Sequence, residues 1–318
     1  MQLKPPPASL VAAFQANVER LTSDDGKVLL AVSGGSDSLA MLLLAHSAMP
    51  SRVHAATVDH GLRLEAADEA AFVASLCGQL AVPHSILYPE KPISGSMQAS
   101  ARVARYALLQ AHAKGTDCAW IATAHHADDQ LETVLMRIAR GSGIDGLSAV
   151  RERRENIIRP LLDFRKDELT AICAQCGVVP VDDPSNRNAS HDRVAMRQWL
   201  ASTEHPFDAK RAVATALSFT EASEALDWTT QQLVLTRVSN NDGHWTMDPD
   251  GVPTELRRRL VLYLLERIQQ GYTPRGEVLE RALGTLVQGG QTMLGDVLCK
   301  GGKLWQFSAA PPRGGTRE

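Results

Sequence analysis

Residues 28–41 read Val-Leu-Leu-Ala-Val-Ser-Gly-Gly-Ser-Asp-Ser-Leu-Ala-Met. An apolar run ends at Ser33, two glycines and three small polar residues follow, and an apolar helical pattern begins at Leu39. This order predicts a strand, a tight loop and a helix. Gly34 and Gly35 permit backbone angles that turn peptide N–H groups toward an anion, and the helix adds free N–H donors and the positive end of its dipole. The stretch therefore predicts a phosphate or pyrophosphate site.

The loop differs from the common P-loop, because it has neither the G-x-x-x-x-G-K-[ST] pattern nor a lysine that would reach the β- and γ-phosphates. It carries an acid instead, Asp37, which would repel phosphate unless Mg²⁺ lay between them. Ser-Gly-Gly alone would also fit an ordinary strand–turn–helix corner, but the whole run after an apolar strand favours nucleotide binding. The predicted ATP-binding residues are Ser33, Gly34, Gly35, Ser36, Asp37 and Ser38.

The polar motifs, in their order along the chain, resemble those of the tRNA(Ile)-lysidine synthetases, a family of the PP-loop superfamily of N-type ATP pyrophosphatases. Residues 33–38 resemble the SGGxDS signature of that superfamily. The other matching segments are VDHGLR at 58–63, TAHHADDQLET at 123–133, RGSGIDGL at 140–147, RPLL at 159–162 and DPSN at 183–186. The resemblance covers about residues 25–200, and residues 210–318 match weakly.

This resemblance implies a ligase that joins free L-lysine to carbon 2 of the wobble cytidine of an isoleucine tRNA with a CAU anticodon. The cytidine is first adenylated with loss of pyrophosphate, and lysine then displaces AMP to give lysidine. ATP and Mg²⁺ are the implied cofactors, with Asp37 as a metal ligand. Two alternatives stay open, a tRNA 2-thiolating PP-loop enzyme and a non-catalytic ATP-binding regulatory module.

Three acids, Asp128, Asp129 and Glu132, open a predicted helix, where the helix dipole alone would favour them. Asp129 and Glu132 are three residues apart and share a face, which would suit an ammonium group or Mg²⁺. The resemblance implies that this pair grips the lysine substrate. It also implies that His125 lies near the phosphates or the activated base.

Three arginines complete the implied site. Arg105, in an A-R-x-x-R-Y run, is implied to face substrate phosphate. Arg193 and Arg197 match the outer arginines of a family R-N-R-I-R segment, in which this chain departs at Val194 and Ala195. The predicted catalytic residues are Asp37, Arg105, His125, Asp129 and Glu132, and the predicted substrate-binding residues are Asp129, Glu132, Arg193 and Arg197.

A histidine pair and a cysteine pair could each indicate a metal site, but structural roles explain both more simply. The pair His125-His126 could indicate zinc, but a zinc site needs three or four ligands, and the nearest cysteine, Cys118, falls in a predicted strand. Cys173 and Cys176 form a C-x-x-C in an amphipathic helical pattern, which favours packing. That pair still matters, because thiolating relatives use cysteine pairs or Fe–S clusters.

Composition limits the remaining choices. The chain has 318 residues, 44% of them hydrophobic, and five cysteines, which suits about two domains without a disulfide framework. It lacks a secretory start and a long apolar segment, so we expect a cytoplasmic protein without a membrane span. The net charge of −3 gives no global nucleic-acid footprint, so tRNA contacts should be local. The candidates are Arg257, Arg258 and Arg259, and a basic segment at 151–166; a homodimer is left open.

Predicted strands at 27–33, 52–58, 84–88 and 118–124 alternate with predicted helices at 38–48, 64–81, 97–114 and 128–140. This alternation predicts an α/β fold with a doubly wound parallel sheet. Three polar motifs directly follow strands, so we expect them to meet in one crevice at the carboxyl ends of the strands.

The pattern changes after residue 150. Residues 151–156 read as loop, and helices are predicted at 165–176 and 191–202. His205-Pro206 suggests a boundary between a catalytic domain at 1–205 and a smaller, mainly helical tRNA-binding domain at 206–318. The predicted elements of that domain are helices at 209–237, 253–270 and 275–288, a short β hairpin at 292–299 and 303–307, and a disordered tail at 309–318.

Overall fold

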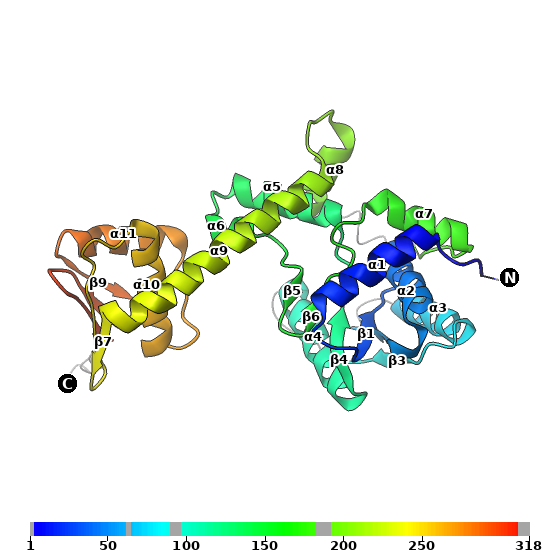
Figure 1. The fold of residues 1–318 in the computed structure, drawn as a ribbon, viewed down its shortest axis with the longest axis horizontal. Coiled ribbons are helices and arrows are strands. Elements are labelled where there is room, and N and C mark those ends of the chain that lie inside the picture. The colour runs from blue at the N-terminus through cyan, green and yellow to red at the C-terminus, as the bar shows by residue number, and fades with distance from the viewer. Residues whose placement is uncertain (1–2, 62–64, 90–96, 182–191, 311–318) are drawn as a thin grey trace, which may run out of the picture. The chain divides into compact units, whose positions relative to one another are not determined.

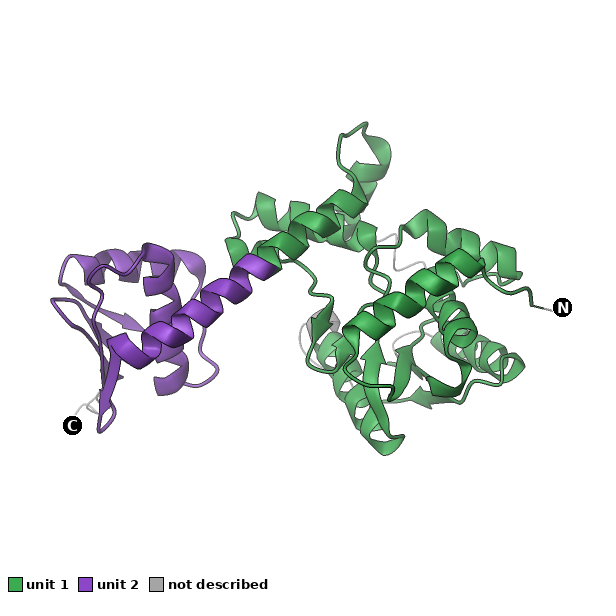
Figure 2. Cartoon of the chain, viewed as in Figure 1, with its two compact units in different colours: residues 1–220 green, residues 221–318 purple. Residues whose placement is uncertain are grey.

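The computed structural model describes residues 3–61, 65–89, 97–181 and 192–310 (Figure 1). The chain forms two compact units, Met1–Thr220 and Glu221–Glu318 (Figure 2). They divide inside helix α9 (Ala209–Arg237), which begins three residues after the boundary expected at His205-Pro206. The catalytic and tRNA-binding roles assigned to the two parts of the sequence stay predictions.

Unit 1 is built on a six-stranded sheet in the order β3-β2-β1-β4-β6-β5. The strands β1, β2, β3, β4 and β6 pair in parallel, and β5 is antiparallel to β6 at one edge. Their bounds are β1 Lys27–Ala31, β2 Val53–Val58, β3 His84–Leu87, β4 Cys118–Ala122, β5 Arg153–Arg154 and β6 Ile157–Ile158. The segment 151–156, predicted as loop, thus contains the two-residue strand β5.

Helices cover both faces of this sheet, which confirms the predicted α/β class. Consecutive residues of β1 point to opposite faces, so Leu30 packs with α1, α2, α3 and α7, whereas Leu29 packs with α4. The bounds are α1 Ala8–Leu21, α2 Ser36–Ala48, α3 Glu65–Gln79, α4 Met97–Gly115 and α7 Lys166–Cys176, with a short 3-10 turn, η1, at Pro50–Arg52. Helix α1 is an addition to the predicted elements.

The rest of unit 1 is a small helical layer. Helix α5 (Ala127–Ala139) packs through Ala127 and Leu131 against Ala209 and Val213 at the start of α9. Leu200 of α8 (Asp192–Ser202) joins the same cluster, and α6 (Ile144–Leu147) follows α5. This packing fixes α5, the helix that opens with the three predicted acids.

Unit 2 combines helices with an antiparallel sheet of five strands in the order β7-β8-β11-β10-β9. The bounds are α10 Thr254–Ile268, α11 Gly276–Val287, β7 Val238–Asn241, β8 His244–Met247, β9 Gln291–Leu294, β10 Val297–Lys300 and β11 Trp305–Ala309. The predicted hairpin region is therefore part of a larger sheet. Ala309, placed in the predicted tail, ends β11, and residues 311–318 lie outside the described residues.

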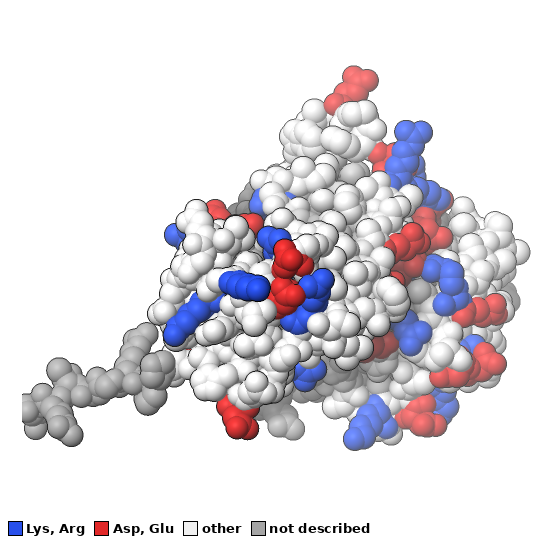
Figure 3. Space-filling model, turned by 60° about the vertical axis from the view of Figure 1, so that its left-hand side comes forward, with Lys and Arg blue, Asp and Glu red and all other residues white. Residues whose placement is uncertain are grey.

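No helix in the described part of the chain is long and apolar enough to cross a membrane. The face of the molecule seen in Figure 3 carries basic and acidic side chains next to one another. That mixture agrees with the small net charge of −3. On this face, charge alone therefore does not mark a binding site.

Candidate active site

A cavity of about 850 Å³ opens at the carboxyl ends of the parallel strands in unit 1. Residues after β1, β2 and β4 line it, so the polar motifs meet as predicted. Its lining includes the polar side chains of Ser33, Ser36, Asp37, His60, Arg102, Arg105, His125, Asp129, Lys166 and Arg193. The part of the VDHGLR motif beyond Gly61, and the DPSN motif, lie outside the described residues.

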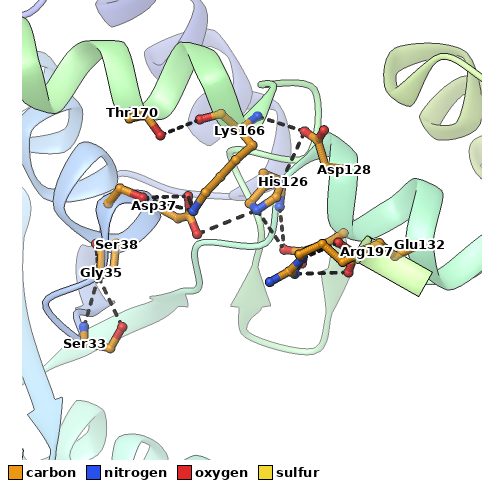
Figure 4. Close-up of polar contacts among 12 residues, drawn as sticks. Ser33, Gly35, Asp37, Ser38, His126, Asp128, Glu132, Lys166, Thr170 and Arg197 are labelled. Atoms are coloured by element: carbon orange, nitrogen blue, oxygen red, sulfur yellow. Dashed lines mark hydrogen bonds and ion pairs between the residues drawn. The ribbon is translucent and has the colours of Figure 1, made fainter. Parts of the chain in front are cut away.

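The loop after β1 is closed by its own polar groups (Figure 4). The Ser33 N–H donates to Ser38 Oγ at 3.0 Å, and that hydroxyl donates to the Gly35 carbonyl, also at 3.0 Å. Gly34 has φ +82°, a conformation that favours glycine. Helix α2 begins directly afterwards, so its first N–H groups face the end of the sheet where the cavity lies.

Lys166 supplies the cation that the loop sequence lacks. Its Nζ lies 2.6 Å from Asp37 Oδ1 and 3.0 Å from Ser36 Oγ (Figure 4). Lys166 is the first residue of α7, and its backbone N–H donates to Asp128 Oδ2 at 2.8 Å. The sequence places this lysine in a basic segment for tRNA, whereas the structure puts its ammonium group on the phosphate loop.

His126 lies among three carboxylates. Its Nε2 is 3.6 Å from Asp37 Oδ2 and 3.5 Å from Asp129 Oδ2, and its Nδ1 is 3.5 Å from Asp128 Oδ2. Burial lowers the pKa of this imidazole, but the three acids raise it more, so the pKa ends above its ordinary value. His126 is absent from the predicted catalytic residues, because only the fold brings Asp37 beside it.

His125, the predicted catalytic histidine, is half-buried and lines the cavity. Its Nδ1 lies 3.0 Å from the Thr123 hydroxyl. Burial lowers the pKa of His125 far below its ordinary value, and nearby arginines add to that effect. The ring is therefore neutral near pH 7 and can exchange hydrogen bonds without carrying charge.

The two predicted lysine-binding acids lie in different environments. Asp129 lines the cavity. Burial would raise its pKa, but His126, His125 and Arg193 lower it below the ordinary value. Glu132 is 2% exposed and is held by Arg197 Nε at 2.6 Å and Arg193 Nε at 3.2 Å. Asp129 thus presents charge to the cavity, whereas the charge of Glu132 is neutralised by arginines.

Arginines from two helices line other parts of the cavity. Arg105 and Arg102 come from α4, and their guanidinium carbons lie 5.8 Å and 5.1 Å from the centre of the Tyr106 ring. Burial lowers the pKa of Arg105, which still leaves a cation at neutral pH. Arg193 comes from α8. The cavity therefore offers positive charge for phosphate together with the carboxylates Asp37 and Asp129.

Comparisons with known proteins agree with this geometry. Residues 9–204 match the PP-loop domain family. The tRNA(Ile)-lysidine synthase of Zymomonas mobilis is 44% identical over 299 residues, which cover 91% of this chain and 90% of that protein. The enzyme of the same name from Novosphingobium aromaticivorans is 40% identical and covers 94% and 93%.

The chain belongs to the tRNA(Ile)-lysidine synthase family. The resemblance read from the motifs is thereby confirmed, as are ATP use and the class of ligases that form C–N bonds. A solved structure, the U34-tRNA thiolase NcsA from Methanococcus maripaludis with its [4Fe-4S] cluster, has a TM-score of 0.55 at 18% identity. The match covers 66% of this chain and 78% of that one, and it shows the shared fold.

The cysteine pair of this lysidine synthase family member serves packing. Cys173 and Cys176 are buried in α7, and the Cys173 thiol donates to the Ser36 carbonyl at 3.3 Å. Burial raises the pKa of Cys173 to about 12 and also raises that of Cys176. Both are therefore protonated at neutral pH, whereas sulfur chemistry and metal binding need thiolates.

The residues around Asp37 fit Mg²⁺ better than a metal held by protein alone. Among the described residues, no group of three or more His, Cys, Asp or Glu side chains is arranged to hold a metal. Mg²⁺ usually takes one or two carboxylates together with substrate phosphates and waters. Asp37 offers such an oxygen at the mouth of the phosphate loop.

The three predicted tRNA-binding arginines lie on α10 of unit 2, and the structure separates them. Arg258 pairs with Glu255 and, at 2.6 Å, with Glu280. Arg259 is 7% exposed and lies 2.5 Å from Asp227. Arg257 instead lines a cavity of about 550 Å³ with Lys303 and Trp305.

Proposed function

We propose that this chain ligates L-lysine to carbon 2 of the wobble cytidine of tRNA(Ile) with a CAU anticodon, through an adenylated cytidine. The observation that carries the proposal is the joining, in one cavity, of a pyrophosphate loop and the ionised carboxylate of Asp129. The loop suits adenylation by ATP, and the carboxylate suits the ammonium group of an amine substrate.

In the first step, oxygen 2 of the cytosine attacks the α-phosphorus of ATP, and the bond to pyrophosphate breaks. The N–H groups at the start of α2 bind the departing pyrophosphate, and Lys166 and Arg105 offset its negative charge. Their contribution is positioning and charge stabilisation rather than covalent chemistry. Lys166 comes from a different element than the loop, but it fills the place of a P-loop lysine.

Mg²⁺, when bound with ATP, would neutralise phosphate charge and orient the leaving group. Asp37 is the residue proposed to hold it. In the structure Asp37 lies 2.6 Å from the Lys166 ammonium group and 3.6 Å from His126 Nε2. The carboxylate is therefore already placed where positive charge must gather around the phosphates.

In the second step, the ε-amine of lysine attacks carbon 2, and the bond to AMP breaks. Asp129 is proposed to hold the ε-ammonium group before it loses a proton. Glu132 takes part indirectly, because its oxygens already accept hydrogen bonds from Arg197. Arg193 and Arg197 are then positioned by Glu132, and Arg193 reaches the cavity.

The experiment is to incubate the purified chain with unmodified tRNA(Ile), ATP, Mg²⁺ and L-lysine and to analyse nuclease digests by mass spectrometry. Lysidine should form, and a tRNA with uridine at the wobble position should stay unmodified. A thiolated nucleoside formed with a sulfur donor would support the 2-thiolating alternative. Absence of tRNA-dependent pyrophosphate release would support the non-catalytic ATP-binding alternative. A cytoplasmic location and a homodimer remain predictions that fit a tRNA-modifying enzyme.

A further inference from the structure

Three aromatic rings meet where α8 turns into α9. Trp199 lies near the end of α8, and His205 and Phe207 lie in the connection to α9. The ring centres are 6.3 Å apart for Trp199 and His205, 6.4 Å for Trp199 and Phe207, and 5.7 Å for His205 and Phe207. We call these three residues the aromatic corner. The segment that carries them, α8 and its connection to α9, lies at the top of Figure 1.

The aromatic corner is exposed in a chain that exposes few aromatic rings. Only 5% of the residues are Phe, Trp or Tyr. The exposed ones in the described part of the chain are Tyr88, Trp199, Phe207 and Trp228, so two of these four meet here. Trp199 is 44% and Phe207 43% exposed. Exposed apolar side chains that lie together mark an interaction site more often than scattered single residues do.

The corner is held in place by packing beneath it. Leu200, which follows Trp199, and Ala209, two residues after Phe207, lie in the same apolar cluster as Leu131 of α5. The Nδ1 atom of His205 is buried and has no hydrogen-bond partner among the described residues. Stacking and packing therefore orient this ring, and the exposed faces are presented on a preformed support.

The same elements build the proposed active site. Asp208, the residue after Phe207, forms an ion pair with Arg165. Arg165 directly precedes Lys166, whose Nζ lies 2.6 Å from Asp37. One ion pair therefore joins the residue after the aromatic corner to the segment that carries Lys166.

We propose that the aromatic corner stacks an unpaired base of the tRNA anticodon loop, next to the target cytidine. This inference rests on the proposed function. Proteins that read RNA loops commonly hold splayed bases on aromatic side chains, and such stacking tolerates any base because each has a π face. Arg211, in the first turn of α9, adds positive charge for the backbone of the same loop.

The test measures binding of an anticodon stem-loop RNA, with the full chain, by quenching of tryptophan fluorescence and by competition. The double variant Trp199→Ala, Phe207→Ala should bind roughly five- to hundredfold more weakly, since stacking of one base is worth about 1–3 kcal/mol. The KM for tRNA should rise by a similar factor, with little change in kcat. Trp228→Ala, which removes an exposed ring in unit 2, is the matched control and should bind like the wild type.

A conservative variant guards against a merely structural effect. Trp199→Phe should keep most of the affinity but lose the RNA-dependent quenching contributed by Trp199. Unchanged affinity in the double variant would overturn the proposal, and so would quenching in Trp199→Phe of the same amplitude as in the wild type. If the double variant turns a wild-type dimer into a monomer with unchanged RNA affinity, the corner is instead an interface with a second copy. If the wild type forms lysidine and the variants bind RNA as tightly as it does, only the role of the aromatic corner is wrong. If the wild type forms no lysidine, the proposed function is wrong as well.

Discussion

The position of Asp37 in the site can be predicted from the sequence, but its partner in the structure cannot. Its place in the phosphate loop is local, because glycines, serines and the acid follow one another in sequence. Its partner Lys166 is 129 residues away, and no local pattern links the two. The absence of a P-loop lysine indicates that a cation must come from elsewhere, but only the packing of α7 on α2 identifies it.

Two substitutions test this pair. Asp37→Asn keeps the size but removes the charge proposed to hold Mg²⁺, so adenylation should be lost in a folded protein. Lys166→Met should slow pyrophosphate release at least tenfold and raise the KM for ATP, because a charge-assisted contact contributes about 1.5–3 kcal/mol. Both rates are measured by tRNA-dependent pyrophosphate release. Lys210→Met is the control, since Lys210 pairs with Glu168 instead. Near wild-type rates in both site variants would contradict the proposed phosphate site.

His84 should make the stability of the fold depend on pH, independently of the active site. Its Nε2 lies 2.9 Å from the Thr57 hydroxyl, and burial lowers its pKa below the ordinary value of 6.5. The unfolded chain therefore binds this proton at a higher pH than the folded chain does. Stability from this group is present above about pH 6.5 and is lost as the pH falls toward the folded pKa.

The corresponding variant is His84→Gln, which keeps a polar group near Thr57 but does not titrate. The free energy of unfolding, measured in urea, should differ between wild type and variant by an amount that changes with pH. The wild type should lose stability relative to the variant between about pH 7 and pH 5. A difference that stays constant across this range would show that His84 titrates alike in both states.

At the scale of elements, α5 separates two acids that look equivalent in sequence. Asp129 and Glu132 share a helix face, but Asp129 lines the cavity and Glu132 is buried beneath two arginines. Asp129→Asn should therefore raise the KM for lysine roughly ten- to hundredfold with little change in melting temperature. Glu132→Gln should lower stability by about 1–3 kcal/mol, because it removes the carboxylate that pairs with Arg193 and the nearer of the two carboxylates beside Arg197. Lysine kinetics and thermal unfolding of both variants, measured together, provide the test. If both variants changed the KM for lysine and the melting temperature to the same extent, Asp129 would not be the lysine-binding acid and Glu132 the structural one.

The long helices of the C-terminal part are elements that the sequence predicts well. The helix predicted at 209–237 has the same bounds as α9, and α10 and α11 differ from their predictions by one or two residues at each end. Strands β7 and β8 are not predicted from the sequence. Strand β7 reads Val-Ser-Asn-Asn and is largely exposed, and asparagine is rare in strands. The turn between them, Asp242-Gly243, has positive φ at both residues and is the one local signal of this hairpin.

At the scale of the whole molecule, charge is distributed rather than concentrated. The net charge is −3, and basic side chains lie beside acidic ones in Figure 3. A protein of this kind binds nucleic acid through a few phosphate contacts, each of which adds a measurable amount to the slope of the log–log salt dependence. Sequence identifies clusters of arginine, but it does not distinguish an arginine in an ion pair from one that faces a cavity.

The cluster on α10 allows that distinction to be tested. Arg258 and Arg259 form ion pairs within unit 2, whereas Arg257 lines a cavity with Lys303, and its buried Nε has no hydrogen-bond partner among the described residues. A phosphate could therefore engage Arg257 without breaking an ion pair. Arg257→Gln should weaken tRNA binding and reduce the log–log salt slope by roughly 0.7–0.9, the value for one lost phosphate contact.

Arg258→Gln is the matched control, because it removes the same charge from the next position of the same helix. It should lower the melting temperature by breaking its contacts with Glu255 and Glu280, and it should leave the salt slope unchanged. Affinity for tRNA is measured at several salt concentrations for the wild type and both variants. Parallel lines of equal affinity for the wild type and Arg257→Gln would remove α10 from the tRNA-binding surface. Of the two basic clusters in the sequence, the segment 151–165 would then remain as a candidate, since Lys166 already contacts the phosphate loop.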